Sequence, residues 1–419
     1  LGLSPDFRKP IESESYGLVS QQGNPSKIVA GQNHVSALKS DGTVWVWGRS
    51  ELGVFRDSGH IVKSTTPIKV PGVNDIIDIA TSSNHMLALK SDGTLLSWGS
   101  NWNGQLGINS ADKGVFGPST VLNISNVSKI CTVSSSSVAL KEDGTVWTWG
   151  DNYLGQLGMS GGHRSIPTKT SIEGIKDVYC GFATVYAIKE DNTVLSWGVD
   201  NNGQLGAGVV LNTRSNSEHV VGGESGESIL SNIKSMSADY TEAAVTFDGE
   251  VYSWGSNSKG QHGNGTVKTA WLHNSSPRKS IIDNVSHVSV KYEHALAVKT
   301  DGTLYSWGSN SSGQLFLGDT LDRHVPVDTG ITDVHQVALT GNSSHIVKKD
   351  GTVWSVGGNS FGQLGNGTEE PSLAPIQVIN ADGTPFTLFE PKEYSKLLEF
   401  ESPHSGEVKF TGQPMNIKF

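Results

Sequence analysis

The chain has 419 residues, a net charge of −10 at neutral pH, 50 glycines and two cysteines. No segment approaches the roughly 18 consecutive apolar residues of a membrane-spanning helix, and no cluster of Lys or Arg suggests a nucleic-acid surface. Composition therefore argues against membrane insertion and against nucleic acid as the main partner, and two cysteines are too few for a disulfide framework.

The first 75 residues contain the elements that recur along the rest of the chain. FRKPIES, around Pro10, reads as an isolated outer strand, and KIVAG and HVSALKS are two short strands. Asp41-Gly42 predicts a two-residue hairpin turn, because glycine adopts positive φ without steric cost. TVWVWG is a third strand with apolar residues on both faces. STTPIKV, around Pro67, is a fourth strand at an edge, where proline is tolerated.

This pattern occurs seven times, each copy running from an aspartate through a short apolar run. Most copies end in Trp-Gly and Asn-x-x-Gly-Gln-Leu-Gly. The copies start at Asp41, Asp92, Asp143, Asp191, Asp248, Asp301 and Asp350. A period near fifty residues indicates a repeat architecture in which each unit buries its apolar surface against a neighbour. Four strands per repeat predict an all-β fold, a seven-bladed β-propeller of four-stranded antiparallel blades.

Residues 1–382 are predicted to form this propeller, with a short C-terminal appendage, or the start of a further domain, over 383–419. The repeats lie near 27–75, 76–126, 127–174, 175–231, 232–285, 286–333 and 334–382. The sequence contains one outer strand more than it has hairpins. Either the strand near 8–14, around Pro10, or the strand around Pro375 is therefore expected to close the ring.

The tryptophans and the Gly-Gln-Leu-Gly segments are predicted to be structural. A buried aromatic ring removes about 150–250 Å² from water, and the recurring glutamines suit residues that satisfy buried backbone groups. Cys131 and Cys180 lie in the innermost strands of successive repeats, at positions of opposite parity. We expect two buried free thiols whose side chains face different ways.

Seven close variants of DGxxxxWGxNxxGQLG resemble the regulator of chromosome condensation family of seven-bladed propellers, over about residues 27–380. The spacing and the tandem Trp-Gly resemble the bacterial branch, which includes a secreted propeller that inhibits β-lactamases. The eukaryotic branch includes a guanine-nucleotide exchange factor for a nuclear GTPase. Three copies depart from the pattern: Val54, Phe55 and Arg56 replace Gln-Leu-Gly in the first, Phe316 interrupts the sixth, and Val356 replaces a tryptophan in the seventh.

No catalytic constellation is visible: the chain has no His-x-x-x-His helix motif, no Cys/His ligand spacing and no phosphate-binding loop. We therefore expect a protein that is not an enzyme and has no cofactor and no metal. The alternative is an enzyme, because a propeller can assemble a catalytic site from residues of distant blades.

The loops between the first and second strands vary while the rest of the repeat does not. In the family that the chain resembles, the exchange factor presents this face to its GTPase. Aromatic and acidic residues there suit protein recognition. The predicted partner-binding residues are Phe182, Asp239, Tyr240, Tyr292, Glu293, Asn33 and Asn84. His34, His85 and His294 recur in the same loops and are expected to hydrogen-bond within their own blades, and the loops bearing Trp102, Tyr153 and Trp271 are the alternative contact surface.

The sequence supports three hypotheses about function. The first is a monomeric, non-catalytic protein-binding scaffold, bacterial and secreted or attached to the cell surface. The second is a guanine-nucleotide exchange factor for a small GTPase, cytoplasmic or delivered into a host cell. The third is a β-lactamase inhibitor, for which the resemblance identifies no interface residues.

Overall fold

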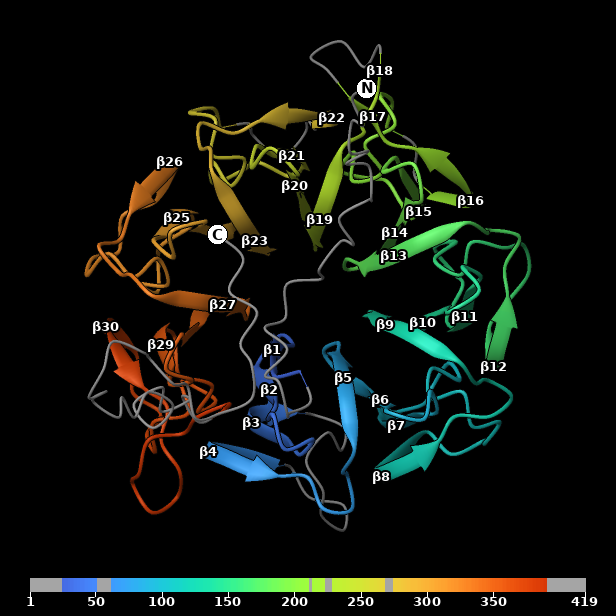
Figure 1. The fold of residues 1–419 in the computed structure, drawn as a ribbon, viewed down its shortest axis with the longest axis horizontal. Coiled ribbons are helices and arrows are strands. Elements are labelled where there is room, and N and C mark those ends of the chain that lie inside the picture. The colour runs from blue at the N-terminus through green and yellow to red at the C-terminus, as the bar shows by residue number, and fades with distance from the viewer. Residues whose placement is uncertain (1–24, 51–61, 211–212, 223–227, 268–273, 390–419) are drawn as a thin grey trace, which may run out of the picture. The chain divides into compact units, whose positions relative to one another are not determined.

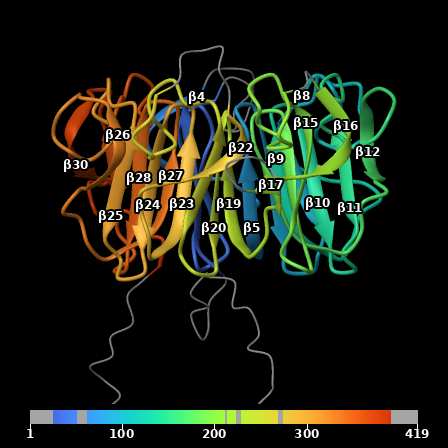
Figure 2. The same ribbon diagram turned by 90° about the horizontal axis from the view of Figure 1, so that it is seen from above.

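A computed structural model describes residues 25–50, 62–210, 213–222, 228–267 and 274–389. Seven four-stranded antiparallel sheets surround a common axis, each with its first strand nearest the axis and its fourth strand outermost (Figure 1). Seen from the side, the blades stand next to one another with their strands running roughly along that axis (Figure 2). The predicted all-β, seven-bladed propeller is confirmed.

Each of the first four blades takes its strands from one contiguous stretch of sequence. Blade 1 contains β1 (Lys27–Ala30), β2 (His34–Leu38), β3 (Val44–Ser50) and β4 (Val62–Lys69). Blade 2 contains β5 (Ile76–Thr81), β6 (His85–Lys90), β7 (Leu95–Ser100) and β8 (Gly114–Thr120). Blade 3 contains β9 (Val127–Val133), β10 (Ser136–Lys141), β11 (Val146–Gly150) and β12 (Arg164–Lys169). Blade 4 contains β13 (Ile175–Cys180), β14 (Thr184–Lys189), β15 (Val194–Val199) and β16 (Thr213–His219).

The last three blades follow the same plan, after a small two-stranded sheet of β17 (Val221–Gly222) and β18 (Ser228–Ile229). Blade 5 contains β19 (Ile233–Ala238), β20 (Thr241–Thr246), β21 (Val251–Gly255) and β22 (Asn274–Lys279). Blade 6 contains β23 (Val285–Lys291), β24 (His294–Lys299), β25 (Leu304–Gly308) and β26 (Arg323–Asp328). Blade 7 contains β27 (Val334–Leu339), β28 (Ser343–Lys348), β29 (Val353–Gly357) and β30 (Ser372–Gln377).

The Asp-Gly hairpins contain one residue more than the two-residue turn predicted. In blade 1, Gly42 N donates to Lys39 O and Lys39 N donates to Thr43 O, so the loop is a three-residue turn with Gly42 at φ +77°. The Asp41 carboxylate accepts hydrogen bonds from the Thr43 amide (2.9 Å) and hydroxyl (2.6 Å). The aspartate therefore caps the turn, and the glycine supplies the positive φ of a hairpin bulge.

Neighbouring blades are joined by a contact between a tryptophan and the backbone of a glutamine. Trp149 Nε1 in blade 3 donates to Gln105 O in blade 2 at 2.9 Å. Four further interfaces repeat this bond at 2.6–3.1 Å, from Trp47, Trp197, Trp254 and Trp307. A side chain on Gly107 would come within 2.8 Å of the Trp149 ring, which explains the last glycine of Gly-Gln-Leu-Gly.

The glutamine side chains accept backbone amides, as predicted, although these amides belong to half-buried rather than buried residues. Gln105 Oε1 accepts the Asn103 amide at 3.0 Å, and the five equivalent glutamines accept the amide two residues earlier at 2.6–3.0 Å. The tryptophans of the Trp-Gly pairs are at most 1% exposed. The structural interpretation of both residue types is confirmed.

Two departures from the repeat meet in one interface and compensate each other. Val356 of blade 7 stands where a tryptophan packs elsewhere, and Phe316 of blade 6 stands where that tryptophan would need a glycine. Both side chains are buried in the same apolar cluster, and Phe316 adopts φ +60°. The smaller residue on one side makes room for the larger one on the other, so the interface stays filled.

The ring closes through side-chain packing between blades 7 and 1, and every blade keeps its own four strands. The strand around Pro375 is β30, the outer strand of blade 7, whereas Pro10 lies outside the described residues. Gln336 accepts the Ile28 amide and donates to Ser26 O across the junction. Residues 380–389 continue past the last strand, and Phe386 and Leu388 are buried in the cluster shared by these blades.

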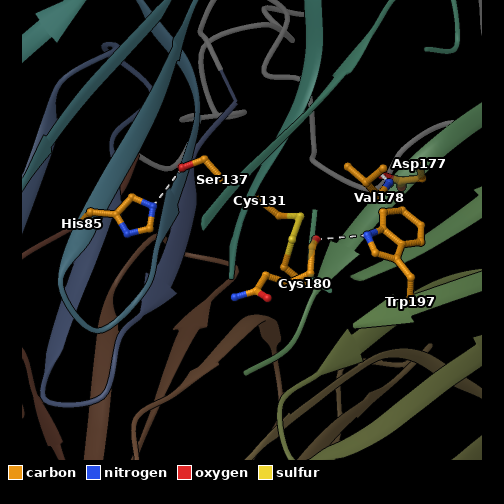
Figure 3. The surroundings of a disulfide bond; sticks show 8 residues. His85, Cys131, Ser137, Asp177, Val178, Cys180 and Trp197 are labelled. Carbon is orange, nitrogen blue, oxygen red and sulfur yellow. Dashed lines mark hydrogen bonds between the residues drawn. A yellow bond between two sulfur atoms is a disulfide. The ribbon is translucent and has the colours of Figure 1, made fainter. Parts of the chain in front are cut away.

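Cys131 and Cys180 form a disulfide between β9 and β13, with their Cα atoms 5.8 Å apart (Figure 3). The prediction of two free thiols facing different ways is therefore wrong. Adjacent blades stack so that one face of each sheet meets the opposite face of the next. Cys131 shares its side of β9 with Val133, Cys180 shares its side of β13 with Val178, and all four lie in one cluster. Opposite parity on successive blades thus brings two side chains together.

Candidate protein-binding face

Three aromatic rings from successive blades form a continuous row on the face that carries the first loops, those between the first and second strands of each blade. Phe182 of blade 4 stacks on Tyr240 of blade 5, with centroids 4.6 Å apart. Tyr240 lies 5.6 Å from Tyr292 of blade 6, at an interplanar angle of 49°. Phe182 is 38% exposed, and both tyrosines are half-buried. We call these three residues the aromatic row.

Two predicted acidic residues fix the loops that carry the row. The buried Asp239 carboxylate accepts the Tyr292 amide at 2.6 Å, which joins blade 5 to blade 6. Burial raises the pKa of Asp239 above its usual value, against the opposing charge of Lys291. Glu293 is half-buried and accepts a hydrogen bond from Ser258 at 3.0 Å. Asp239 is therefore a positioning residue rather than an exposed contact.

The backbone and the phenol of Tyr292 both depart from ordinary values. Its φ is +51°, a conformation that a bulky side chain rarely adopts and that marks local strain. Burial, together with the charge of Asp239, raises the pKa of Tyr292 to about 12. The Tyr292 phenol therefore stays a neutral hydrogen-bond donor even at pH 10, where an ordinary tyrosine is half ionised.

Asn33 and Asn84 lie in the first loops of blades 1 and 2, away from the aromatic row. Both are half-buried. Their backbone carbonyls accept amides of the strand that ends beside them, from Arg49 and Ser100, at 2.8 Å. The same kind of bond, from Ser309 to Glu293, shows that the loops following the third strands share this face. The structure thus places the two asparagines on the predicted face but does not bring them to the row.

The loop histidines also bridge blades, so the predicted bonds within their own blades are only part of their contacts; His85 Nδ1 does lie 2.8 Å from Ser82 Oγ of its own blade. His34 Nε2 lies 2.7 Å from Thr81 Oγ1 of blade 2, and His85 Nε2 lies 3.0 Å from Ser137 Oγ of blade 3. His294 makes the same contact with blade 7 at 3.1 Å. Burial lowers the pKa of each of these imidazoles to about 3, so they are neutral.

Glu242 is a buried acid that sequence reasoning missed. It follows the Tyr240 loop in β20, is fully buried, and has a pKa raised well above its usual value, mainly by burial. The signal was available, because the other repeats carry only small or apolar residues at this position. They are Val35, Met86, Ser137, Val185, Ala295 and Ser344. A fully buried carboxyl group thus lies between blades 4 and 5, near Tyr186 and Asp200 of blade 4.

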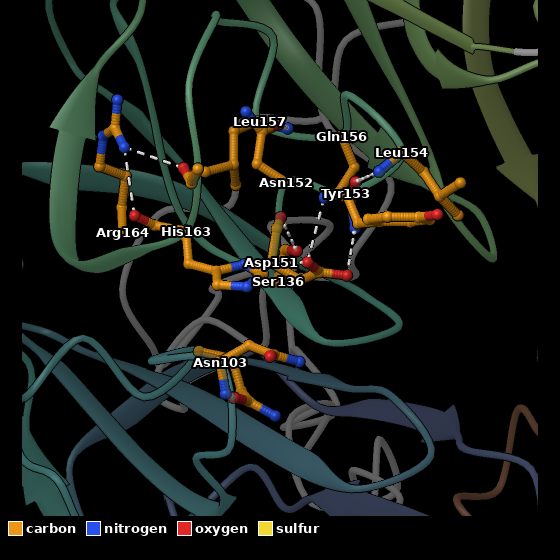
Figure 4. Close-up of polar contacts among 12 residues, drawn as sticks. Asn103, Ser136, Asp151, Asn152, Tyr153, Leu154, Gln156, Leu157, His163 and Arg164 are labelled. Atoms are coloured by element: carbon orange, nitrogen blue, oxygen red, sulfur yellow. Dashed lines mark hydrogen bonds and ion pairs between the residues drawn. The ribbon is translucent and has the colours of Figure 1, made fainter.

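A second pair of aromatics is more exposed, on the loops that follow the third strands of blades 2 and 3. Tyr153 is 86% exposed and Trp102 is 60% exposed. Asp151 holds the Tyr153 loop by accepting the Tyr153 amide at 3.0 Å and pairing with His163 at 3.0 Å (Figure 4). Lys113 lies over the Trp102 ring. Trp271, the third residue of this alternative surface, is outside the described residues.

The described residues also limit the chemistry available. In these parts of the chain, no group of three or more His, Cys, Asp or Glu side chains is placed to hold a metal ion. No helix among the residues with assigned structure is long and apolar enough to cross a membrane.

Family models match nearly the whole chain. A model described as RCC1-like domain matches residues 6–271. The model of the regulator of chromosome condensation (RCC1) repeat matches residues 248–298, 301–345 and 350–390.

The share of the relative that this chain covers differs between two related proteins. The ultraviolet-B receptor UVR8 of Arabidopsis thaliana is 30% identical, over 71% of this chain and 68% of the receptor. The E3 ubiquitin-protein ligase HERC2 of Mus musculus is 27% identical over 78% of this chain, which spans 6% of the ligase. These relatives are eukaryotic, so the expected bacterial origin gains no support from them.

Two solved structures share the fold at low sequence identity. Human WBSCR16 superimposes with a TM-score of 0.69 at 20% identity, over 81% of this chain and 94% of that one. Prp20p of Saccharomyces cerevisiae superimposes with a TM-score of 0.65 at 22% identity, over 75% of this chain and 80% of that one.

Proposed function

Because the chain belongs to the family of RCC1-like propellers, we propose that it is a non-catalytic scaffold that binds another protein through the aromatic row. The observation that carries the proposal is the contact of three partly exposed rings from three successive blades. At the same loop positions the other repeats have small or polar residues, including Gln32, Ser83 and Gly341. The fold therefore does not require aromatic rings there, whereas protein interfaces favour them.

The related propellers supply context for this proposal. The study of Prp20p describes its binding to Gsp1p and histones, and another structure shows Kap60 bound to yeast RCC1. The net charge of −10 disfavours a nucleic acid as the partner. We therefore propose that the partner is a protein and that the chain itself is a monomer.

We also propose that the protein is exported from the cell, because it contains a disulfide. Disulfides persist in oxidising compartments and are rare where thiols are kept reduced. Protein isolated from its native source and alkylated under denaturing conditions without a reductant should take up no label at Cys131 or Cys180. Full labelling of both residues would place the protein in a reducing compartment.

Site-specific photocross-linking tests where the partner binds. A benzophenone amino acid at Tyr240 should capture one discrete protein. The same amino acid at Phe247, which is 50% exposed and follows the opposite end of the same strand β20, should not. Capture from position 247 alone, or equally from both positions, would overturn the proposed face.

Direct assays test two more specific functions. As an exchange factor, the protein would accelerate release of a labelled nucleotide from a small GTPase, and the Tyr240→Ala/Tyr292→Ala variant would not. As an inhibitor, it would reduce hydrolysis by a serine β-lactamase with the same dependence on the row. Without either effect, the plain binding scaffold remains.

A further inference from the structure

The disulfide lies next to the aromatic row in the sequence and in space. Cys180 ends β13, and Phe182 is the second residue after it. Both cysteines are half-buried and lie in the first strands of their blades, nearest the axis (Figure 1). We propose that the Cys131–Cys180 disulfide positions the Phe182 loop, so that its reduction releases Phe182 from the row and weakens partner binding. The binding part of this inference rests on the proposed function.

Two other blade interfaces are held at this level by a hydrogen bond between side chains. Between blades 2 and 3, His85 Nε2 lies 3.0 Å from Ser137 Oγ. Between blades 6 and 7, His294 Nε2 lies 3.1 Å from Ser344 Oγ. Each pair joins the start of the second strand in one blade to the second strand of the next.

The interface between blades 3 and 4 cannot form this bond. The corresponding residues are Ser136 and Val185. Ser136 Oγ donates to Asp151 O of its own blade at 2.7 Å, and valine has no polar side-chain atom. No hydrogen bond in the described part of the chain joins residues 133–137 of blade 3 to residues 180–184 of blade 4. At this level, the disulfide is therefore the direct link between the side chains of blades 3 and 4.

On its other side, the Phe182 loop is attached only by weak contacts. The Phe182 amide donates to Asp239 O at 3.3 Å, and its ring stacks on Tyr240. Within the loop, Gly181 N donates to Thr184 O at 2.9 Å. A stacked aromatic pair contributes only about 0.5–1.5 kcal/mol. Val199 N also donates to Ala183 O at 3.0 Å within blade 4. The disulfide is therefore the covalent restraint that fixes the Phe182 loop relative to blade 3.

Reduction of the bond requires a dithiol reductant. One thiolate of the reductant attacks a cystine sulfur, and the other cysteine leaves as a thiolate. The second thiol then resolves the mixed disulfide. Two electrons and two protons pass to the protein, which gains two thiols, and the reductant becomes a disulfide. The partial exposure of both cysteines gives the reductant access.

Hydrogen exchange on the folded full chain tests the positioning. With dithiothreitol, the amides of Gly181 and Phe182 should exchange at least tenfold faster, and reoxidation should restore their protection. The matched control is Gly341 in the first loop of blade 7, which donates to Gln32 O at 3.2 Å and has no cysteine nearby. Its exchange should change less than twofold.

Two exchange results would overturn the positioning. Unchanged exchange at Gly181 and Phe182 would show that the disulfide does not hold the loop. Equal acceleration at Gly341 would show general loosening instead. The Cys131→Ser/Cys180→Ser variant should reproduce the effect of reduction and exclude other actions of the reductant.

Binding of the protein captured at Tyr240 tests the second part. Reduction should weaken binding of the parent at least threefold and leave the affinity of Phe182→Ala unchanged. Equal weakening in both would overturn a route through Phe182. If no partner is captured at Tyr240, the proposed function fails and the coupling to binding fails with it, but the exchange data still decide the positioning.

Discussion

The blade interfaces and the face that carries the first loops obey different rules. At five interfaces the same tryptophan nitrogen meets the same glutamine carbonyl. On the face, one loop carries a phenylalanine, others tyrosines, and others only asparagine, glutamine, serine or glycine. Repetition therefore marks what the fold requires, and departure from repetition marks the positions that are free to serve binding.

Acid should act first through the buried histidines, three of which bridge blades, whereas His345 bonds Ser355 of its own blade. Burial lowers the pKa of His34, His85, His294 and His345 from 6.5 to about 3. The unfolded chain therefore binds more protons between these values. The stability that neutral imidazoles allow is complete above pH 6.5 and is lost as the pH falls towards 3. Each histidine contributes about 1.4 kcal/mol per pH unit, so the four together cost about 8 kcal/mol at pH 5.

Urea denaturation between pH 7 and pH 5 measures this effect. His85→Gln should flatten the dependence on pH by about a quarter, because one of the four groups no longer titrates. A free energy of unfolding that stays constant over this range would show that the histidines are accessible to protons in the folded state.

Trp149→Ala should cost roughly 3–5 kcal/mol, since it deletes a large buried ring and its bond to Gln105 O. Trp102→Ala is the matched control, because that ring is 60% exposed, and should change stability by less than about 0.5 kcal/mol. Equal shifts in the denaturation midpoint would contradict the division between interface and surface.

Removal of the disulfide should cost about 2–4 kcal/mol, because it releases a loop closed over 49 residues. Equilibrium unfolding of Cys131→Ser/Cys180→Ser checks this value. A loss below about 1 kcal/mol would mean that blades 3 and 4 hold together without the cross-link.

The aromatic row should matter for binding and little for stability. Tyr240→Ala/Tyr292→Ala should weaken partner binding at least tenfold, about 1.4 kcal/mol, while the melting temperature stays nearly unchanged. Phe247→Ala, at the opposite end of β20, should bind like the parent. Parent-like affinity of the double variant, measured by calorimetry, would shift attention to the loops of Trp102 and Tyr153.

The fold could be predicted from the sequence because each repeat carries the same kinds of turn, core and hydrogen-bonding residues. The turn aspartates, the buried tryptophans and the glutamines all lie where their pattern placed them. The rest depended on how neighbouring sheets face each other. Because of that geometry, Cys131 forms a disulfide with Cys180, His85 bonds a serine of the next blade, and Phe316 packs in one cluster with Val356. A single repeat does not contain this information.

The same geometry explains which part of the site was predictable. Phe182, Tyr240 and Tyr292 stand out in a loop alignment, and their contact follows from successive blades. The burial of Asp239 does not follow, because it depends on the backbone of the next loop. Glu242 was missed because its position in the second strand reads as scaffold.

During synthesis on the ribosome, the junction between blades 7 and 1 can form only after blade 7 has been made. Trp47 obtains its acceptor from Gln363, 316 residues later, and Phe386 and Leu388 cover the same cluster. At about 5–20 residues per second, the flank of blade 1 stays uncovered on the order of tens of seconds after its synthesis. During translation this apolar flank is the surface most open to wrong pairing, so a chaperone that acts on the nascent chain would have its longest opportunity there.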